Sequence, residues 1–473
     1  MLISFLLFLT GFTLIGLSSS RKSLGTKQDY YIASKSVPPW LVGLSAVATN
    51  NSGYMFIGVI GYTYTTGLAS FWLMAGWISG DYLASLFVHN RLRKAAENTG
   101  SVSYAGVLSH WYGNSHDIVQ RLIGIISLIF LLTYAAAQLT AGSKALFVLL
   151  DWPLWSGAVV GAILVSMYCM AGGIRASIWT DAAQSIVMII AMAVLLVVAI
   201  ISAGGPAEAI ASLNAVEGYM DWFPKDLVVP GIAGGILFAV SWLFAGMSVI
   251  GQPHIMVRFM TLNDSGKMRQ ARAWYYLWFT AFYFSATCVG LLARIYLNDA
   301  SAFDAELALP LMAQQLLPGF MVGLILAGIF SATMSTADSL VLSCSSSLTH
   351  DLFEKKVSKT VYLKISTLVI TGLALLLALL NKQSVFNLVI FAWSGLASAF
   401  APLLLALCLG MRPSQNLTII AVLIGFSVAV IWRLLGLHEN VYEGLPGICS
   451  GLAVLGASQL QKKIKPRSPP INS

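Results

Sequence analysis

The chain has 473 residues, of which 58% are hydrophobic and 10% charged, and its formal net charge is +8. A soluble domain of this size would need many more polar residues to cover its surface, so this composition excludes one. Apolar stretches recur from end to end, and most are long enough to cross about 30 Å of hydrocarbon. The sequence therefore predicts an all-α polytopic membrane protein.

In chain order, the apolar stretches predict about thirteen transmembrane helices. They lie near residues 2–20, 38–62, 68–89, 119–149, 154–172, 180–203, 230–250, 273–297, 318–347, 361–380, 385–410, 416–436 and 445–460. No linker-like segment divides them, which favours a single transmembrane domain over 1–465 with a cytoplasmic tail at 466–473. The five cysteines lie in apolar stretches without paired spacing, as is typical of small core residues.

The distribution of Lys and Arg predicts the orientation of these helices. Basic residues gather in alternate loops, including RKSLGTKQDYYIASK at 21–35, RLRK at 91–94 and RFMTLNDSGKMRQAR at 258–272. The loops between them, such as 204–229 and 298–306, hold few basic residues and several acids. Because basic loops stay in the cytoplasm, we expect the N-terminus outside and the C-terminus inside, in the inner (plasma) membrane of the cell.

The basic excess is thus a topology signal, and no nucleic-acid partner is expected. The sequence also contains no phosphate-binding loop, no zinc-binding spacing and no nucleophile elbow. We therefore expect no enzymatic activity and no catalytic residue, with the lipid bilayer as the main partner of the surface.

The first informative cluster is SAVATNNSGYMFIG at 45–58, which lies inside an otherwise apolar span. Asn and Ser side chains can bond to nearby backbone, and Gly weakens a helix, so TNNSG predicts a local break. A helix unwound in the membrane presents bare carbonyl groups, which suit cations and small zwitterions. The alternative is a kinked helix whose polar groups are satisfied by a neighbour.

The second cluster is GIFSATMSTADSLVLSCSSS at 328–347. Ser335, Asp338 and Ser339 share one helical face at spacings i, i+3 and i+4. An acid inside a membrane span indicates a functional site, and hydroxyl and carboxylate oxygens suit sodium. A further acid, Asp181, begins the span at 180–203, where helix capping is the alternative explanation.

At these residues the chain resembles the sodium/solute symporter family, and within it the members that carry proline. The motifs shared with the family, in order, are YYIASKSVP at 30–38, SAVATNNSG at 45–53, GGIRASIWTD at 172–181, GQPHIMVRF at 251–259, TMSTADS at 333–339, FAWSGLASAFAP at 391–402 and LPGI at 445–448. Because their order and spacing are kept over nearly the whole chain, the resemblance is highly specific.

The resemblance implies a leucine-transporter-type fold with two inverted five-helix repeats. In that scheme residues 1–20 form a leading helix, 38–410 the inverted-repeat core and 416–460 two trailing helices. The second and seventh spans would be discontinuous.

The resemblance also implies the site residues. The expected sodium ligands are the carbonyls of Ala48, Asn51 and Ala332 and the hydroxyls of Ser335 and Thr336. The expected solute contacts are Ser52, Gly53, Tyr54, Tyr134, Ala245 and Val249. A second cation site is expected from Asp181, Ser335, Asp338 and Ser339.

Three departures from the proline-carrying members concern the solute pocket. Asn50 stands where those members have an acid, and Tyr54 replaces a tryptophan. Ala245 and Val249 replace aromatic residues, which would leave a differently shaped pocket.

The expected function is sodium-coupled symport of a small organic solute by alternating access, with sodium as the co-transported ion. Proline or a related amino acid is the first expectation for the solute, and a carboxylate or vitamin-like solute is the alternative. A membrane sensor of the same fold is an alternative of another class. We expect the chain to function as a monomer.

Overall fold

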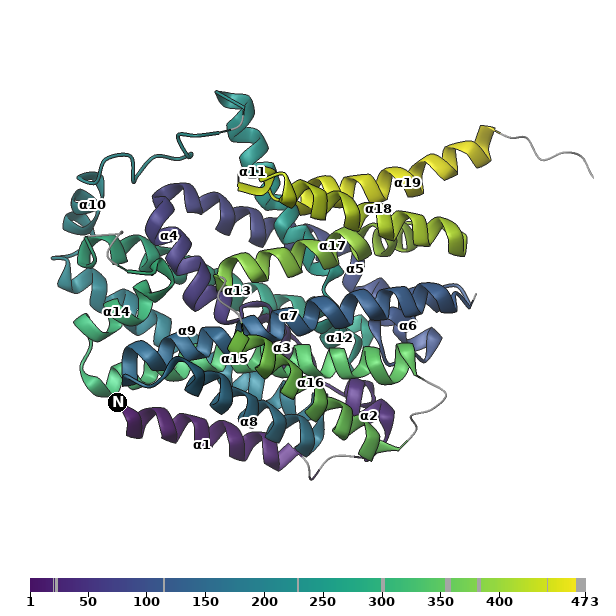
Figure 1. The fold of residues 1–473 in the computed structure, drawn as a ribbon, viewed down its shortest axis with the longest axis horizontal. Coiled ribbons are helices and arrows are strands. Elements are labelled where there is room, and N and C mark those ends of the chain that lie inside the picture. The colour runs from purple at the N-terminus through teal and green to yellow at the C-terminus, as the bar shows by residue number, and fades with distance from the viewer. Residues whose placement is uncertain are drawn as a thin grey trace, which may run out of the picture.

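The computed structural model describes residues 1–464 apart from 20, 22–23, 114, 228, 299–302, 354–358, 381–383 and 440. Over those residues it is helical, and its sole β-type contact is an isolated bridge between Val37 and Leu262. Figure 1 shows the long helices running side by side as one bundle. The expected tail, 466–473, lies outside the described residues.

The predicted spans correspond to helices α1 (Leu2–Ser19), α3 with α4 (Pro39–Asn50 and Ile60–Thr66), α5 (Phe71–Thr99), α7 (Asp117–Leu150), α8 (Leu154–Gly172), α9 (Ile174–Ser202), α11 (Ile232–Met247), α13 (Met268–Tyr296), α15 (Gly319–Ser346), α16 (Thr360–Leu380), α17 (Val385–Cys408), α18 (Gln415–Leu434) and α19 (Gly444–Ile464). Shorter helices are α2 (Lys27–Ile32), α6 (Tyr104–His110), α10 (Pro206–Asn214), α12 (Pro253–Met260) and α14 (Ala308–Leu316).

Within the described residues, 11 helical stretches are long and apolar enough to span a membrane by themselves. Two of the expected spans are not counted among them. The span at 38–62 is interrupted after α3, and its second half continues into α5. In the last span, the apolar stretch that was counted covers only the Gly444–Ala457 part of α19.

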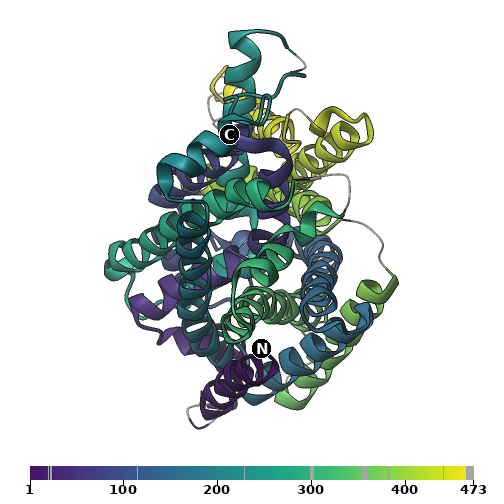
Figure 2. The same cartoon turned by 90° about the vertical axis from the view of Figure 1, so that its left-hand side faces the viewer.

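Helix α15 lies at the centre of the bundle. In its most apolar stretch of 18 residues, 89% of the residues are buried, compared with 33% in α1 at the edge of the bundle. Helices α7, α9, α8, α16 and α3 all pack against it. Figure 2 shows α1 at one edge, and α18 and α19 at the opposite edge. Because α15 has protein on all sides, its polar residues meet other helices and not lipid.

The second span is broken where the sequence predicts it. Helix α3 ends at Asn50, and Asn51 leaves the helical region with φ −87° and ψ 54°. A π-helical turn, Tyr54–Val59, then leads into α4. Gly53 keeps an ordinary helical φ of −53°, so backbone conformation does not require a glycine here. The lack of space for a Cβ atom does, because Thr333, Ala141 and Gln138 lie against this position.

The seventh span is also discontinuous, as the resemblance implies. Helix α11 continues as a 3-10 turn, Ser248–Gly251, and Gln252 then adopts an extended conformation with φ −98° and ψ 101°. Helix α12 begins at Pro253 and returns into the bundle against α3, α5 and α15. The two breaks therefore place backbone ends of α3 and α11 in the protein interior.

Candidate functional site

The end of α3 and the middle of α15 bring oxygen atoms together beside the first break. The Ser335 hydroxyl lies 3.1 Å from the carbonyl oxygen of Ala48 and 3.1 Å from that of Ala332. The Thr336 hydroxyl donates to the carbonyl of Thr49 at 2.9 Å. All are fully buried. Carbonyl and hydroxyl oxygens gathered in this way are suitable ligands for a hard cation.

Four of the five expected sodium ligands thus lie together, namely Ala48, Ala332, Ser335 and Thr336. Thr49 was not among the expected residues, and its carbonyl lies in the same group. Asn51 stands at the break itself, where its side-chain amide donates to the carbonyl of Val47 at 3.1 Å. Its side-chain oxygen is buried without a hydrogen-bond partner.

The expected solute residues Ser52, Gly53, Tyr54 and Tyr134 form a second group on the other side of the break. The Tyr134 hydroxyl lies 3.1 Å from the Ser52 hydroxyl. The Gly53 N–H donates to the side-chain oxygen of Gln138 at 2.8 Å. Helix α7 therefore contacts the unwound segment through two polar side chains one turn apart, those of Tyr134 and Gln138. Gln138 was not expected from the sequence.

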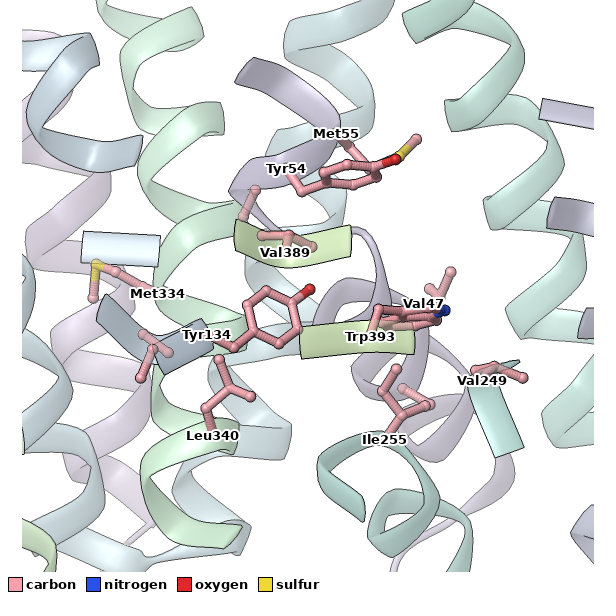
Figure 3. Packing of buried hydrophobic residues seen from close by; sticks show 14 of the residues in the cluster. Val47, Tyr54, Met55, Tyr134, Val249, Ile255, Met334, Leu340, Val389 and Trp393 are labelled. Atoms are coloured by element: carbon pink, nitrogen blue, oxygen red, sulfur yellow. The ribbon is translucent and has the colours of Figure 1, made fainter. Parts of the chain in front are cut away.

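Aromatic rings cover this segment. Tyr54 packs against Phe386 and Trp77, with centroid distances of 5.3 and 5.7 Å. Trp77 in turn lies 5.2 Å from Trp393 of α17. Figure 3 shows Tyr54, Tyr134 and Trp393 among the surrounding apolar side chains.

Trp393 also explains the small residues at Ala245 and Val249. Its indole N–H donates to the carbonyl of Ala245 at 3.0 Å, and both Ala245 and Val249 are fully buried. A larger side chain at either position would compete with this indole for volume. The sequence placed Trp393 in a family motif without assigning it to the pocket.

The residues expected at a second cation site lie one turn further along α15. The Ser177 hydroxyl of α9 lies 2.9 Å from a carboxylate oxygen of Asp338 and 3.5 Å from one of Asp181. The Ser339 hydroxyl lies 3.1 Å from Asp338. The Ser335 hydroxyl points to the carbonyls described above, and its own carbonyl accepts the Ser339 hydroxyl at 2.6 Å.

A guanidinium group occupies the middle of this cluster. Arg258 of α12 is fully buried, with its Nη2 atom 3.3 Å from Asp181 and 3.8 Å from Asp338. In the sequence Arg258 stood among the basic residues of an expected cytoplasmic loop. The structure places Arg258 in a buried helix and not in a loop, because α12 folds back into the bundle.

A third buried acid, Asp81 of α5, was also missed. It accepts hydrogen bonds from Tyr275 at 2.6 Å and Tyr276 at 2.8 Å. Asn50, at the end of α3, donates to the same Tyr275 hydroxyl at 2.5 Å. The chain therefore keeps a carboxyl group near the break, although on a different helix from the one the resemblance implies.

The two ends of the bundle differ. At one end Lys144 of α7 pairs with Asp304 at 2.6 Å and with Glu306 at 2.5 Å. Glu306 also accepts hydrogen bonds from the backbone N–H groups of Val385 and Phe386 at the start of α17. These contacts fasten α7 and α17 together over the broken helix.

At the other end a small hollow, with room for little more than one water molecule, lies beside the second cluster. Its lining includes Tyr31, Ser103, Arg258, Ser339, Ser346 and Asp351. These residues come from α2, the segment before α6, α12 and the end of α15, all on the expected cytoplasmic side. Ion pairs therefore lie at one end, where Lys144, Asp304 and Ser384 also line a cavity of about 560 Å³, and a much smaller hollow lies at the other.

Comparisons with known proteins identify the family of the chain. A family model for the sodium:solute symporter family matches residues 30–425. The chain is 28% identical to the high-affinity proline transporter PutP of Bacillus subtilis (strain 168), with 90% of each protein covered. It is also 28% identical to the sodium/proline symporter of Escherichia coli (strain K12), with 95% of this chain and 91% of that protein covered.

Solved structures agree on the fold. A Na+-coupled sialic acid symporter in a substrate-bound, outward-open state superposes with a TM-score of 0.81 at 18% identity, covering 97% of both chains. Mhp1, a nucleobase-cation-symport-1 family transporter, superposes with a TM-score of 0.59 at 15% identity, covering 92% of this chain and 95% of that one. The chain belongs to the sodium:solute symporter family.

Proposed function

We propose that the protein carries proline or a related small amino acid into the cell together with sodium, by alternating access. The observation that carries the proposal is the meeting of the Ser335 and Thr336 hydroxyls with the carbonyls at the end of α3. These hydroxyls donate to the carbonyls. A sodium ion between them would replace these hydrogen bonds, because both kinds of oxygen can turn a lone pair towards it.

The proposed sodium ligands are Ala48, Asn51, Ala332, Ser335 and Thr336. A bound ion would tie the broken half-helix α3 to the fixed central helix α15. Ion binding would therefore stabilise one arrangement of the break, and the adjoining solute site would form only in that arrangement. This linkage is the physical basis of coupling, since two ligands that favour the same state bind cooperatively.

The solute side has polar groups without partners. The Asn51 side-chain oxygen, the Tyr54 hydroxyl and the Gln138 side-chain NH₂ group are buried and make no hydrogen bond. Buried polar groups of this kind are costly unless a ligand satisfies them. An amino acid offers donors at its ammonium group and acceptors at its carboxylate, and the surrounding rings favour a compact apolar side chain. The names of the 28% identical relatives point to proline.

Alternating access would require the two ends of the bundle to open in turn. We propose that the Lys144–Glu306 contacts break when the protein opens to the outside. The hollow beside Arg258 would serve as the exit to the cytoplasm. Figure 1 shows the N-terminus and the far end of α19 at opposite ends of the bundle, as the proposal of an outside N-terminus and a cytoplasmic C-terminus requires.

The proposal includes a single transmembrane domain that functions as a monomer. Both proposed sites are built from helices of one chain, so a single transmembrane domain is sufficient as a functional monomer in the plasma membrane. No second subunit is needed to complete the described ligands.

The test is uptake of radiolabelled solutes into proteoliposomes, with an inward sodium gradient or with potassium in its place. The panel contains proline, other small amino acids, monocarboxylates and vitamins. Sodium-dependent accumulation of proline or a similar amino acid supports the proposal. If only a carboxylate or a vitamin is taken up with sodium, that compound replaces proline as the proposed solute. If a solute binds but none accumulates, the result favours a membrane sensor.

A further inference from the structure

Asp81 of α5 has no part in the proposed function, although it is fully buried beside the first break. Its two carboxylate oxygens are held by different phenol groups, one by the Tyr275 hydroxyl and the other by the Tyr276 hydroxyl. A buried carboxyl group is costly unless hydrogen-bond donors satisfy it. The two neighbouring tyrosines of α13 therefore make an acid possible at this position.

Tyr275 extends this contact to the end of α3. Its hydroxyl donates to Asp81 at 2.6 Å and accepts from the side-chain NH₂ group of Asn50 at 2.5 Å. The same NH₂ group lies 3.5 Å from the carboxylate itself. Asn50 is the last residue of α3. The three side chains thus form one hydrogen-bonded chain that runs from α5 through α13 to the residue at which the helix stops.

The ring of Tyr275 is held firmly in place. It is fully buried and packs against Phe259 and Phe279, with centroid distances of 5.8 and 5.7 Å. Helices α13 and α3 also lie close together, since a Cβ atom on Gly43 would lie 2.5 Å from the carbonyl oxygen of Ala271. A hydroxyl group fixed in this way offers the end of α3 one defined place to bond.

Asp81 also lies where α5 meets the second broken helix. A Cβ atom on the preceding residue, Gly80, would overlap the carbonyl oxygen of Leu243 in α11. One on Gly246 of α11 would overlap the carbonyl oxygen of Trp77 in α5. Backbones this close leave α5 little freedom to shift against α11. The hydrogen-bonded chain therefore holds the first break in a fixed relation to the helix that leads into the second.

Tyr276 provides an internal comparison. Its hydroxyl donates to Asp81 at 2.8 Å, and its ring packs against Tyr82 with a centroid distance of 5.1 Å, so both contacts are to α5. Among the described residues it makes no hydrogen bond to α3. Tyr276 thus satisfies the same carboxylate as Tyr275 without contacting the break.

We propose that Asp81 is a positioning residue for the first break: through the Tyr275 hydroxyl it fixes the Asn50 amide, and with it the point at which α3 ends. The carbonyls of Ala48 and Thr49, in the last turn of α3, then keep the positions that a sodium ion needs. This inference rests on the proposed function, because it concerns how the proposed sites are held in shape. It gives this task to α5 and α13, which supply none of the proposed sodium ligands.

Equilibrium binding of ²²Na⁺ to the purified full-length chain in detergent tests the inference without a solute. Tyr275→Phe should raise the sodium concentration for half-saturation about fivefold, because a buried hydrogen bond that holds the break is lost. Tyr276→Phe is the matched control, since it removes the same atom from the same carboxylate, and it should change this concentration less than about twofold. Equal shifts in the two variants would overturn the inference, because a purely structural role of Asp81 would affect both alike.

Asp81→Ala tests whether the acid acts through Tyr275. It should weaken sodium binding as much as Tyr275→Phe does, and the double variant should bind no more weakly than either single variant. Residues that act through one another are non-additive, whereas independent effects would multiply to a loss of about 25-fold. A loss of that size in the double variant overturns the inference. If Asp81→Ala does not fold, the comparison of Tyr275→Phe with Tyr276→Phe decides the question.

Hydrogen–deuterium exchange separates this inference from the proposed function. Backbone amides at 50–56 should exchange faster in Tyr275→Phe and Asp81→Ala than in the wild type and Tyr276→Phe, because the break has lost its anchor. Unchanged exchange in both variants overturns the positioning role, whatever their sodium affinity. A wild type that binds no sodium contradicts the proposed function, and the exchange comparison then still tests how the break is held.

Discussion

Two hydroxyl groups on α15 provide the most direct test of the sodium site. We expect Ser335→Ala and Thr336→Ala each to raise the sodium concentration for half-maximal uptake by about tenfold, since a lost ligand in a buried site costs on the order of 1–3 kcal/mol. Ser331→Ala is the control, because its buried hydroxyl bonds only to Ala327 in its own helix. Sodium activation curves in liposomes measure the effect, and unchanged curves for both variants would remove these residues from the site.

The glycine in the break is expected to be irreplaceable. A Cβ atom on Gly53 would lie 2.5 Å from the Thr333 methyl group and 3.1 Å from Ala141, so the segment would have to move. Overpacking of this kind costs roughly 1–3 kcal/mol, and we expect Gly53→Ala to lower sodium-dependent uptake at least tenfold. Gly372→Ala on α16 is the control, because a Cβ there meets nothing within 4 Å. Equal uptake by the two variants would contradict the tight packing at the break.

The Glu306 carboxylate accepts hydrogen bonds from the first backbone N–H groups of α17. We expect Glu306 to contribute more to stability than the neighbouring Asp304. The side chain of Glu306 is 7% exposed and that of Asp304 is 49% exposed, although both pair with Lys144. We expect Glu306→Gln to lower the free energy of unfolding by about 1–3 kcal/mol, because a buried ion pair is broken. Asp304→Asn should change it by only about 0–1 kcal/mol. Thermal unfolding in detergent ranks the two variants, and the reverse order would be inconsistent with Glu306 as the main fastening.

The elements themselves were largely predictable. TNNSG predicts a break because its polar side chains compete for backbone hydrogen bonds, and α3 does end there. The second break, at Gln252, came only from the resemblance, since a Gly-Gln-Pro sequence after an apolar span reads equally well as the start of a loop.

The orientation of the whole molecule can be tested with reporter fusions. A fluorescent protein that folds only in the cytoplasm should be bright when fused after Ser473, and alkaline phosphatase, which is active only outside, should be inactive there. Fusions after Glu217 in the loop between α10 and α11 should show the reverse pattern. The opposite result at both positions would invert the proposed topology.

The sequence could not predict how distant charges meet. Arg258 lies in a basic segment that hydropathy assigns to the cytoplasm, and its burial depends on α12 folding back against α3 and α15. Asp81 is similarly satisfied by Tyr275 and Tyr276, nearly two hundred residues away. Such contacts depend on tertiary packing, so the spacing of residues along the chain does not predict them.

The oxygen cluster between α3 and α15 has a consequence for how far the solute can be concentrated. One sodium ion that moves inward through about 100 mV and down a tenfold gradient releases about 3.7 kcal/mol, enough for accumulation of roughly 500-fold. A second transported ion would square that ratio, to the order of 10⁵. An ion bound between α3 and α15 would therefore set the ceiling on accumulation, and the cell would have to expel one sodium for each ion bound in this way.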